Sequence, residues 1–196
     1  QVYTEEPAQT GPRRVTVRRA GELGVVGISY KSPAASHEDM AALNVLGGIL
    51  SSGKTSRFYR APTDKNLTTG VSAEAGLFHD PSLFQIYAYL APGAGHEQVE
   101  KILRDEIARV ARDGVTDAEA AMAVRKISAN IAYARDGTAA VAASLNEWIA
   151  AGDWTLYSTY PGRVAKVTMS DVKRVAQKYL VEDQSTTGWF VPVVSR

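Results

Sequence analysis

The sequence of 196 residues contains no cysteine, which excludes disulfides, thiolate metal sites and cysteine nucleophiles. No apolar stretch approaches the roughly 20 residues that a membrane-spanning helix requires, so no membrane span is predicted. Lysine and arginine (22) nearly balance aspartate and glutamate (21), and the net charge of +1 gives no electrostatic reason to expect nucleic acid as a partner. With 45% hydrophobic and 22% charged residues, the composition is typical of one globular domain with a sizeable core.

Histidine is also scarce: the sequence has three, at positions 37, 79 and 96, and none completes a known zinc motif. His96 and Glu97 begin like H-E-x-x-H, in which two histidines one helical turn apart bind the metal, but position 100 is glutamate. The inverted motif H-x-x-E-H and the serine-hydrolase motif G-x-S-x-G are absent. Since zinc needs about three protein ligands, the sequence predicts no catalytic residue and no metal ligand in this chain.

Residues 48–55 match the phosphate-binding pattern G-x-x-x-x-G-K-[ST] at every required position. In a P-loop, a buried strand leads into the glycines and a long helix begins at the lysine. Here the preceding residues repeat apolar side chains with helical spacing, and Ser36 and Asp39 are spaced like a capping box at the start of that helix. Pro62 ends the segment that follows after less than two turns. This context predicts that the four motif residues do not bind a nucleotide: Gly48, Gly53, Lys54 and Thr55.

The first 12 residues are predicted to form an extended arm or linker, and residues 13–196 to form a single domain. Two strand pairs are predicted, at 14–19 with 25–30 and at 69–75 with 83–90, each joined by a turn, and a closing strand at 186–193. Helices are predicted at 40–50, 99–110, 116–134, 138–151, 154–166 with an interruption near Pro161, and 168–179. Paired strands with helices between and after them predict an α+β fold, an antiparallel sheet with helices packed on one face.

Several segments, taken in order, resemble motifs of one family of zinc peptidases. Residues 46–60 resemble its "iLggG-x-S-S-R-L-y" segment, and residues 114–119, 167–180 and 189–192 resemble three later motifs. The resemblance covers roughly residues 13–193 and is to the zinc peptidases related to insulinase, pitrilysin and the mitochondrial processing peptidase. The resemblance implies the processing-peptidase-like sandwich fold. It also marks four residues as structural landmarks of the family: Ser52, Ser56, Arg57 and Tyr59.

The resemblance further implies which repeat of the family this chain is. Such peptidases are built from repeated domains, of which one carries the zinc motif H-x-x-E-H and another supplies an arginine and a tyrosine that help hold the substrate peptide. Thr63 and Thr69 stand at the positions that match this arginine and tyrosine, so both specialised functions are missing. The chain therefore resembles a non-catalytic repeat, the second domain of a long bacterial peptidase in which zinc is held upstream.

A repeat of this kind is expected to form part of the substrate chamber and to support proteolysis carried out by the H-x-x-E-H domain. Its expected partners are other domains of the same polypeptide or a homologous subunit, together with the peptide substrate. One alternative is an inactive homologue that serves assembly or peptide binding alone, and nucleotide binding through residues 48–55 is the third. The expected compartment is the periplasm or cytoplasm of a bacterium, with the periplasm favoured.

Overall fold

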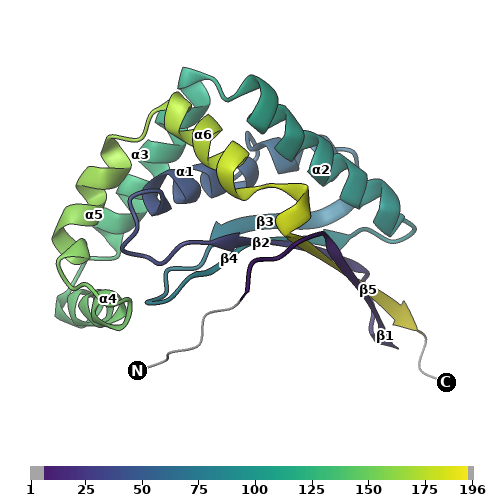
Figure 1. Ribbon diagram of the computed structural model, residues 1–196, viewed down its shortest axis with the longest axis horizontal. Helices are drawn as coiled ribbons and strands as arrows, with labels where there is room; N and C mark the ends of the chain where they lie inside the picture. The colour runs from purple at the N-terminus through teal and green to yellow at the C-terminus, as the bar shows by residue number, and fades with distance from the viewer. Residues whose placement is uncertain (1–6, 194–196) are drawn as a thin grey trace.

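The computed structural model describes residues 7–193 and places five strands in one sheet. The strands are β1 (Arg13–Ala20), β2 (Val25–Ser32), β3 (Thr68–Ala75), β4 (Ser82–Leu90) and β5 (Ser185–Val193), in the order β1-β5-β2-β4-β3 across the sheet. The helices are α1 (Met40–Ser51), α2 (His96–Asp113), α3 (Asp117–Tyr133), α4 (Thr138–Ala150), α5 (Leu156–Ala165) and α6 (Met169–Tyr179), with the short helical segments η1 (Tyr59–Thr63) and η2 (Glu182–Gln184). In Figure 1 most helices form a layer on one side of the sheet, and α4 lies apart from them at the lower left.

The core lies between the sheet and the helices packed on it, with α1 at its centre. Strands β2 and β4 alternate in burial, as expected for a sheet with one covered face, and their buried side chains include Val26, Ile28, Tyr30, Phe84, Ile86 and Ala88. Helix α1 buries nine of its 12 residues because it runs through the middle of the helical layer. A Cβ atom at Gly47 would lie 2.7 Å from the carbonyl oxygen of Ala73, so this glycine allows α1 to approach β3 closely.

The strand order differs from the predicted pairing in one place. The sequence predicts that β1 and β2 pair directly through the turn at 21–24, but β5 lies between them. Strand β5 pairs in parallel with β1 and antiparallel with β2, so that Gly188 lies beside both Val15 and Gly27. The connection at 21–24 therefore crosses two strand spacings, about 10 Å, which four extended residues can span. The predicted fold class is confirmed, with this one parallel pair in an otherwise antiparallel sheet.

The predicted capping box at the start of α1 is wrong. Asp39 occupies the N-cap position, but its side chain makes no capping hydrogen bond. The carboxylate is 0% exposed and accepts hydrogen bonds from three groups of α6: Arg174 Nη1 (2.6 Å), Lys178 Nζ (2.8 Å) and the Tyr179 hydroxyl (2.8 Å). Burial by itself would raise the pKa of Asp39, but these donors outweigh it and lower the pKa to about 2. Asp39 thus joins the first helix to the last.

Helix α5 is continuous, so the predicted interruption near Pro161 is also wrong. Proline has no N–H group, and the carbonyl of Tyr157, four residues earlier, loses its usual helical donor. The guanidinium of Arg135, which follows α3, donates a hydrogen bond to that carbonyl and lies 4.3 Å from the centre of the Tyr157 ring. A contact from the turn after α3 therefore satisfies the carbonyl that proline leaves unpaired.

The part of the predicted arm within the described residues, 7–12, contains neither helix nor strand and runs beside one end of the sheet. Gln9 Nε2 donates to the Ser185 carbonyl at 2.8 Å, and Lys31 Nζ donates to the Pro7 carbonyl at 3.3 Å. Residues 1–6 of this arm lie outside the described residues. Within 7–193, no helix has both the length and the apolar character that crossing a membrane requires.

Candidate functional site

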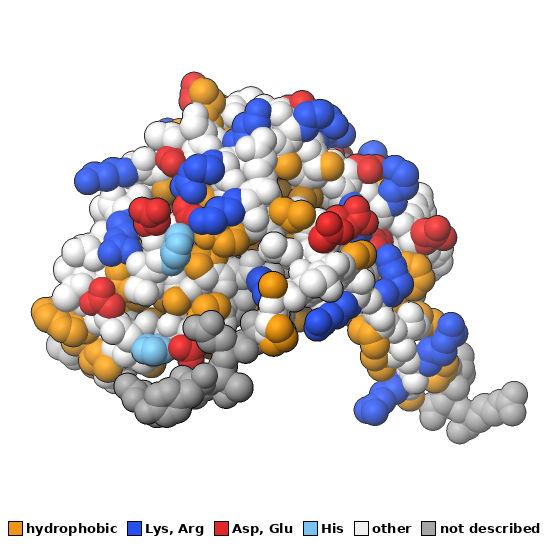
Figure 2. Space-filling model, viewed as in Figure 1, with side chains coloured by type: hydrophobic (Ala, Val, Ile, Leu, Met, Phe, Trp, Pro, Cys, Tyr) orange, Lys and Arg blue, Asp and Glu red, His pale blue; other side chains and the backbone are white. Residues whose placement is uncertain are grey.

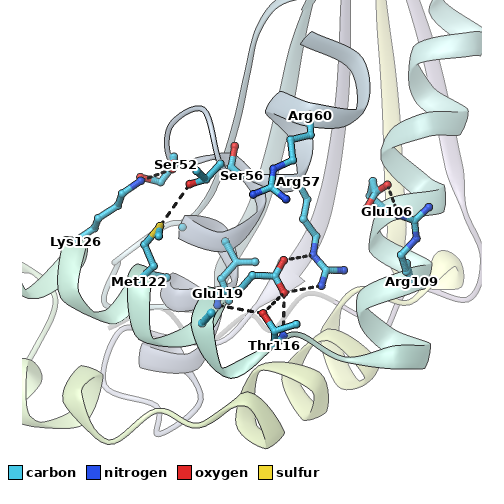
Figure 3. Close-up of a pocket in the computed structure, with 15 residues that line it drawn as sticks. Ser52, Ser56, Arg57, Arg60, Glu106, Arg109, Thr116, Glu119, Met122 and Lys126 are labelled. Atoms are coloured by element: carbon cyan, nitrogen blue, oxygen red, sulfur yellow. Dashed lines mark hydrogen bonds and ion pairs between the residues drawn. The ribbon is translucent and has the colours of Figure 1, made fainter. Parts of the chain in front are cut away.

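A cavity of about 480 Å³ opens where the end of α1, the segment before η1, the start of α3 and one side of α2 meet. It contains three of the four family landmarks, Ser52, Ser56 and Arg57. Figure 3 shows basic and acidic side chains from these elements pointing into it. The contacts within this cavity therefore indicate what Ser52, Ser56 and Arg57 do in the domain.

The central contact of the cavity is an ion pair between Arg57 and Glu119. Arg57 donates from Nε at 2.8 Å and from Nη2 at 3.0 Å to the two carboxylate oxygens, and Nη2 also donates to the Gly114 carbonyl at 3.2 Å. Glu119 completes the capping box of α3, because its Oε2 accepts from the backbone N–H of Thr116 at 2.8 Å. Hydrogen bonds from Arg57 lower the pKa of Glu119 to about 2, against the opposing effect of burial. The pair fixes η1 against the N-terminus of α3 (Figure 3).

The other charges around the cavity are largely paired within the domain. Lys126 Nζ donates to the Ser52 carbonyl at 2.7 Å and so binds α3 to the C-terminus of α1. Arg109 lies 3.0 Å from Glu106 on the same helix. Ser56, only 4% exposed, accepts a hydrogen bond from the backbone N–H of Tyr59 at 3.3 Å. These contacts tie Ser52, Ser56, Arg57 and Tyr59 to neighbouring parts of the domain. Their role as structural landmarks of the family stays a prediction.

The residues that match the P-loop pattern lie in a helix and its C-terminal turn. Gly48 is inside α1, Ser52 is its C-cap, and Gly53 has φ +82°, the left-handed conformation that commonly ends a helix. The hydroxyl of Thr55 contacts the sulfur of Met122 at 3.4 Å. A P-loop needs a strand in place of α1, so the geometry agrees with the context read from the sequence. The absence of nucleotide binding remains a prediction.

Thr63 and Thr69, which stand where the family has its substrate-holding arginine and tyrosine, make short neutral contacts. The hydroxyl of Thr63 lies 2.8 Å from that of Thr68, and the hydroxyl of Thr69 donates to the Tyr89 carbonyl at 3.4 Å. Neither side chain can form a charged or aromatic contact with a peptide. Binding by this domain must therefore use other groups.

The three histidines lie on separate parts of the fold. His96 Nε2 is 2.8 Å from the Phe190 carbonyl, His37 Nδ1 accepts from the Asp39 N–H at 3.0 Å, and His79 lies 3.0 Å from the Asp80 carboxylate. Among residues 7–193, no group of three or more histidine, cysteine, aspartate or glutamate side chains is placed to hold a metal ion. The described residues therefore do not fit a zinc site.

Glu100, which stands where H-E-x-x-H would have its second histidine, is a buried anchor that the sequence reading missed. Its carboxylate accepts from Arg14 at 2.6 and 2.7 Å, from Arg104 at 2.9 Å and from Trp189 Nε1 at 2.8 Å. Burial would raise the pKa of Glu100, but the bonds from Arg14 and Arg104 outweigh it and hold the pKa below its ordinary value. The sequence contains one signal for this burial, because position 100 shares a helical face with the apolar residues Leu103 and Ile107.

The face of the sheet opposite the helices carries exposed apolar side chains. Tyr87 (36%), Tyr89 (48%) and Leu83 (39%) project from β4, and Val15 (50%) and Val17 (40%) project from β1. Between them lie the paired glycines of β2 and β5, and the Tyr87 ring rests over Gly27. The outer strands of the sheet are β1 and β3, whose free edges can pair with a further extended chain. On this face Gln85 Nε2 donates a hydrogen bond to the Tyr87 hydroxyl at 3.0 Å, while the apolar side chains remain open to solvent.

The fold and the described residues define a class, an α+β domain whose five-stranded sheet has one covered and one open face. A family model described as the peptidase M16 inactive domain matches residues 1–127. The chain belongs to this family.

The relatives are zinc proteases of bacteria. The zinc protease PqqE of Helicobacter pylori is 27% identical over 192 residues, which cover 97% of this chain and 43% of that protein. An uncharacterized zinc protease of Streptomyces coelicolor is 29% identical over 189 residues, or 89% of this chain and 40% of that protein. The chain thus spans less than half the length of these relatives.

Solved structures agree with this assignment. A protease from Helicobacter pylori superposes with a TM-score of 0.91 at 27% identity, over 97% of this chain and 46% of that one. The inactive peptidase domain of a zinc protease from Bordetella parapertussis superposes with a TM-score of 0.82 at 27% identity, over 92% of this chain and 96% of that one. The resemblance to a non-catalytic repeat of the zinc peptidase family is confirmed.

Proposed function

We propose that this chain is the non-catalytic domain of a zinc-dependent bacterial peptidase, in which it forms part of the substrate chamber. The observation that carries the proposal is the open face of the sheet, which exposes Leu83, Tyr87 and Tyr89 in a domain of the M16 inactive family. Exposed apolar surface on a folded domain is costly unless it meets a ligand or a partner. We assign this face to the inside of the chamber.

The substrate that suits this face is an extended peptide with apolar side chains. Tyrosine rings offer broad contact area with a polar rim, and a free strand edge offers backbone hydrogen bonds that do not depend on sequence. The charged contact that an arginine at position 63 would supply is missing. Recognition by this domain is therefore expected to tolerate many sequences.

Zinc would be held by a separate H-x-x-E-H domain, where it would supply the Lewis-acid chemistry for peptide hydrolysis. The described residues of this chain supply no ligand set for that chemistry. Their proposed contribution is to bind the peptide and to hold it near the catalytic domain.

The test uses the full-length polypeptide with Tyr87→Ser and Tyr89→Ser combined. We expect KM for an apolar peptide to rise about tenfold, because losing two half-exposed rings costs on the order of 1–2 kcal/mol of binding. Zinc content and kcat should be unchanged, since neither tyrosine touches the metal. Tyr133→Ser is the matched control, because Tyr133 is 80% exposed but lies at the end of α3, away from the sheet.

Three results would contradict the proposal. An unchanged KM in the double variant would remove the sheet face as a substrate surface. Stoichiometric zinc and chelator-sensitive cleavage in the 196-residue chain alone would show that it is catalytic. A full-length protein that binds peptides without cleaving them would support the inactive homologue that serves assembly or peptide binding alone.

A further inference from the structure

Helix α4 is an apolar helix without a buried residue. Its sequence, TAAVAASLNEWIA, contains one charged side chain, Glu147, and no residue of the helix is buried. A helix in a globular domain normally buries an apolar stripe and exposes a polar one. Figure 1 shows α4 at the lower left, beyond the end of the main helical layer. The domain therefore covers the apolar surface of α4 only in part: Val141, Leu145 and Trp148 are half-buried, and Ile149 is exposed.

The surroundings of α4 are apolar as well. A cavity of about 510 Å³ lies between α3, α4 and α5, with Trp148 and Leu156 in its lining. Leu77 (39% exposed) also lines this cavity, and three more exposed side chains lie within two residues of its lining residues in the sequence: Phe78 (63%), Ile149 (55%) and Trp154 (63%). We call these four residues the α4 patch. In Figure 2 hydrophobic side chains gather at the left edge, where Figure 1 draws α4.

The α4 patch is one surface, although its residues come from two loops and a helix. Leu77 lines the same cavity as Trp148 and Leu156, so the β3–β4 loop reaches the helices. A Cβ atom at Gly152 would lie 2.4 Å from the ring of His79, so that loop also touches the turn between α4 and α5. Single exposed apolar residues are common on proteins, whereas a joined cluster marks a contact surface.

We propose that the α4 patch is the docking surface for another domain of the same polypeptide. The inference rests on the proposed function in one respect, that this chain works as one domain of a longer protein. The relatives are long enough to contain such a domain, since the matched region makes up only 43% and 40% of their lengths. The expected partner surface is apolar, because the α4 patch carries no charge of its own.

The position of residues 7–12 supports a partner in the same chain. Pro7 lies beside Lys31 at the end of β2, and three residues after that strand the N–H of Ala35 donates to the Phe78 carbonyl at 2.9 Å. The arm thus lies at the same end of the sheet as the α4 patch. A domain connected through this arm would be close to the patch without any long linker.

The size of the patch favours a connected domain over a second copy of the chain. A stable interface between separate proteins buries about 800 Å² on each partner, more than four partly exposed side chains provide. A covalent link supplies an effective concentration in the millimolar range, so a smaller apolar contact is sufficient. Domain interfaces within a chain accordingly begin at about 600 Å² of buried surface.

The test is thiol labelling of Ile149→Cys and Trp154→Cys, each in the full-length polypeptide and in the 196-residue chain. The shorter form is suitable because its core is made from its own residues and the chain contains no native cysteine. We expect labelling about tenfold slower or more in the full-length protein, because a docked domain must open before the thiol can react. Lys101→Cys, on the exposed side of α2 with 73% of its lysine side chain exposed, is the control and should react equally in both forms.

Equal labelling of positions 149 and 154 in the two forms would overturn the proposal. So would slowing that depends on protein concentration in the 196-residue chain, since this would identify a second copy as the occupant. The readout does not involve catalysis. If the full-length protein proves unable to cleave peptides while both thiols are protected, the chamber function fails and the docking surface stands.

Discussion

At the scale of single residues, two buried acids make contacts between elements that local sequence patterns do not predict. Asp39 precedes a helix, and its position suggests a cap, yet its carboxylate is bound by Arg174, Lys178 and Tyr179 from α6. Glu100 likewise joins α2 to the sheet, because its carboxylate accepts hydrogen bonds from Arg14 of β1 and Trp189 of β5. Each acid is stabilised as an anion by several donors, which offsets the cost of burying the charge.

The first prediction concerns Asp39→Asn. The amide keeps the shape of the side chain but removes the charge that two cations face, and its NH₂ group cannot accept their hydrogen bonds. We expect the free energy of unfolding to fall by about 1–3 kcal/mol, less than for a fully buried pair because Arg174 and Lys178 are half exposed. Urea denaturation measures this loss. Asp105→Asn, in an exposed pair with Lys101, should leave the midpoint unchanged, and an equal loss in both variants would contradict the assigned role.

The second prediction concerns acid. The pKa values of Asp39 and Glu119 are both lowered in the fold to about 2, from ordinary values of 3.8 and 4.5. A lowered pKa means that the unfolded chain takes up protons first, so the stabilisation is complete above about pH 4.5 and is lost as pH falls towards 2. We expect the urea midpoint of the wild type to fall as the pH is lowered through this window. The difference in urea midpoint between wild type and Asp39→Asn should become smaller over the same range. A difference that stays constant from pH 7 to 2.5 would count against the ionised Asp39.

At the scale of elements, α3 and α6 both begin with a capping box, but the two boxes differ in the side chains that contact them. Thr116 with Glu119 caps α3, and Thr168 with Asp171 caps α6, each with reciprocal hydrogen bonds. Only the first is joined by a bidentate arginine, Arg57 from beside η1, with 15% of its side chain exposed. The sequence predicts both caps, whereas the arginine contact depends on how the helices pack.

The third prediction compares the two caps. Glu119→Ala should lower the free energy of unfolding by about 2–3 kcal/mol, because it removes the N3 half of the capping box and leaves Arg57 without its carboxylate partner. Asp171→Ala, which removes only the N3 half of a capping box at the surface, should cost about 1 kcal/mol. Thermal or urea unfolding of the two variants decides between these values. Equal losses would show that the Arg57 contact adds nothing to the cap.

At the scale of the whole molecule, the sheet has helices on one face and an open face that exposes Tyr87 and Tyr89. Two partial motifs, H-E at His96 and the P-loop pattern at 48–55, lie at internal contacts: His96 contacts the Phe190 carbonyl of β5, and Ser52 accepts a hydrogen bond from Lys126 of α3. Among residues 7–193, the two surfaces that we propose to be functional are the open sheet face and the α4 patch. Both are apolar, which fits a domain that acts through contact with peptides and other domains.

The fourth prediction tests the P-loop resemblance in the intact chain. Binding at a hundredfold excess of ligand over its dissociation constant stabilises a protein by about 2.7 kcal/mol, which for a domain of this size raises Tm by about 5–10 °C. We expect no shift with magnesium-ATP, because α1 occupies the place of the strand that a phosphate loop requires. A shift that disappears in Lys54→Ala would establish nucleotide binding and overturn this interpretation.

The sequence by itself determined the elements and the family of this protein. Periodicity located the helices and strands, and the boxes at Thr116 and Thr168 marked two helix starts, because these signals depend on neighbours within about one turn. The ordered motifs from residue 46 to 192 indicated a non-catalytic peptidase repeat, which the family match confirms.

Only the tertiary structure decided how those elements meet. The alternation in β1 and β2 is the same whether they pair directly or through β5, since strand order depends on contacts between segments more than 150 residues apart in the chain. The partners of Asp39, Glu100 and the Tyr157 carbonyl come from other elements or loops for the same reason: helix α6, strands β1 and β5, and the segment after α3. The apolar surface of α4 could be read from its composition, but its exposure could be known only once the packing around it was complete.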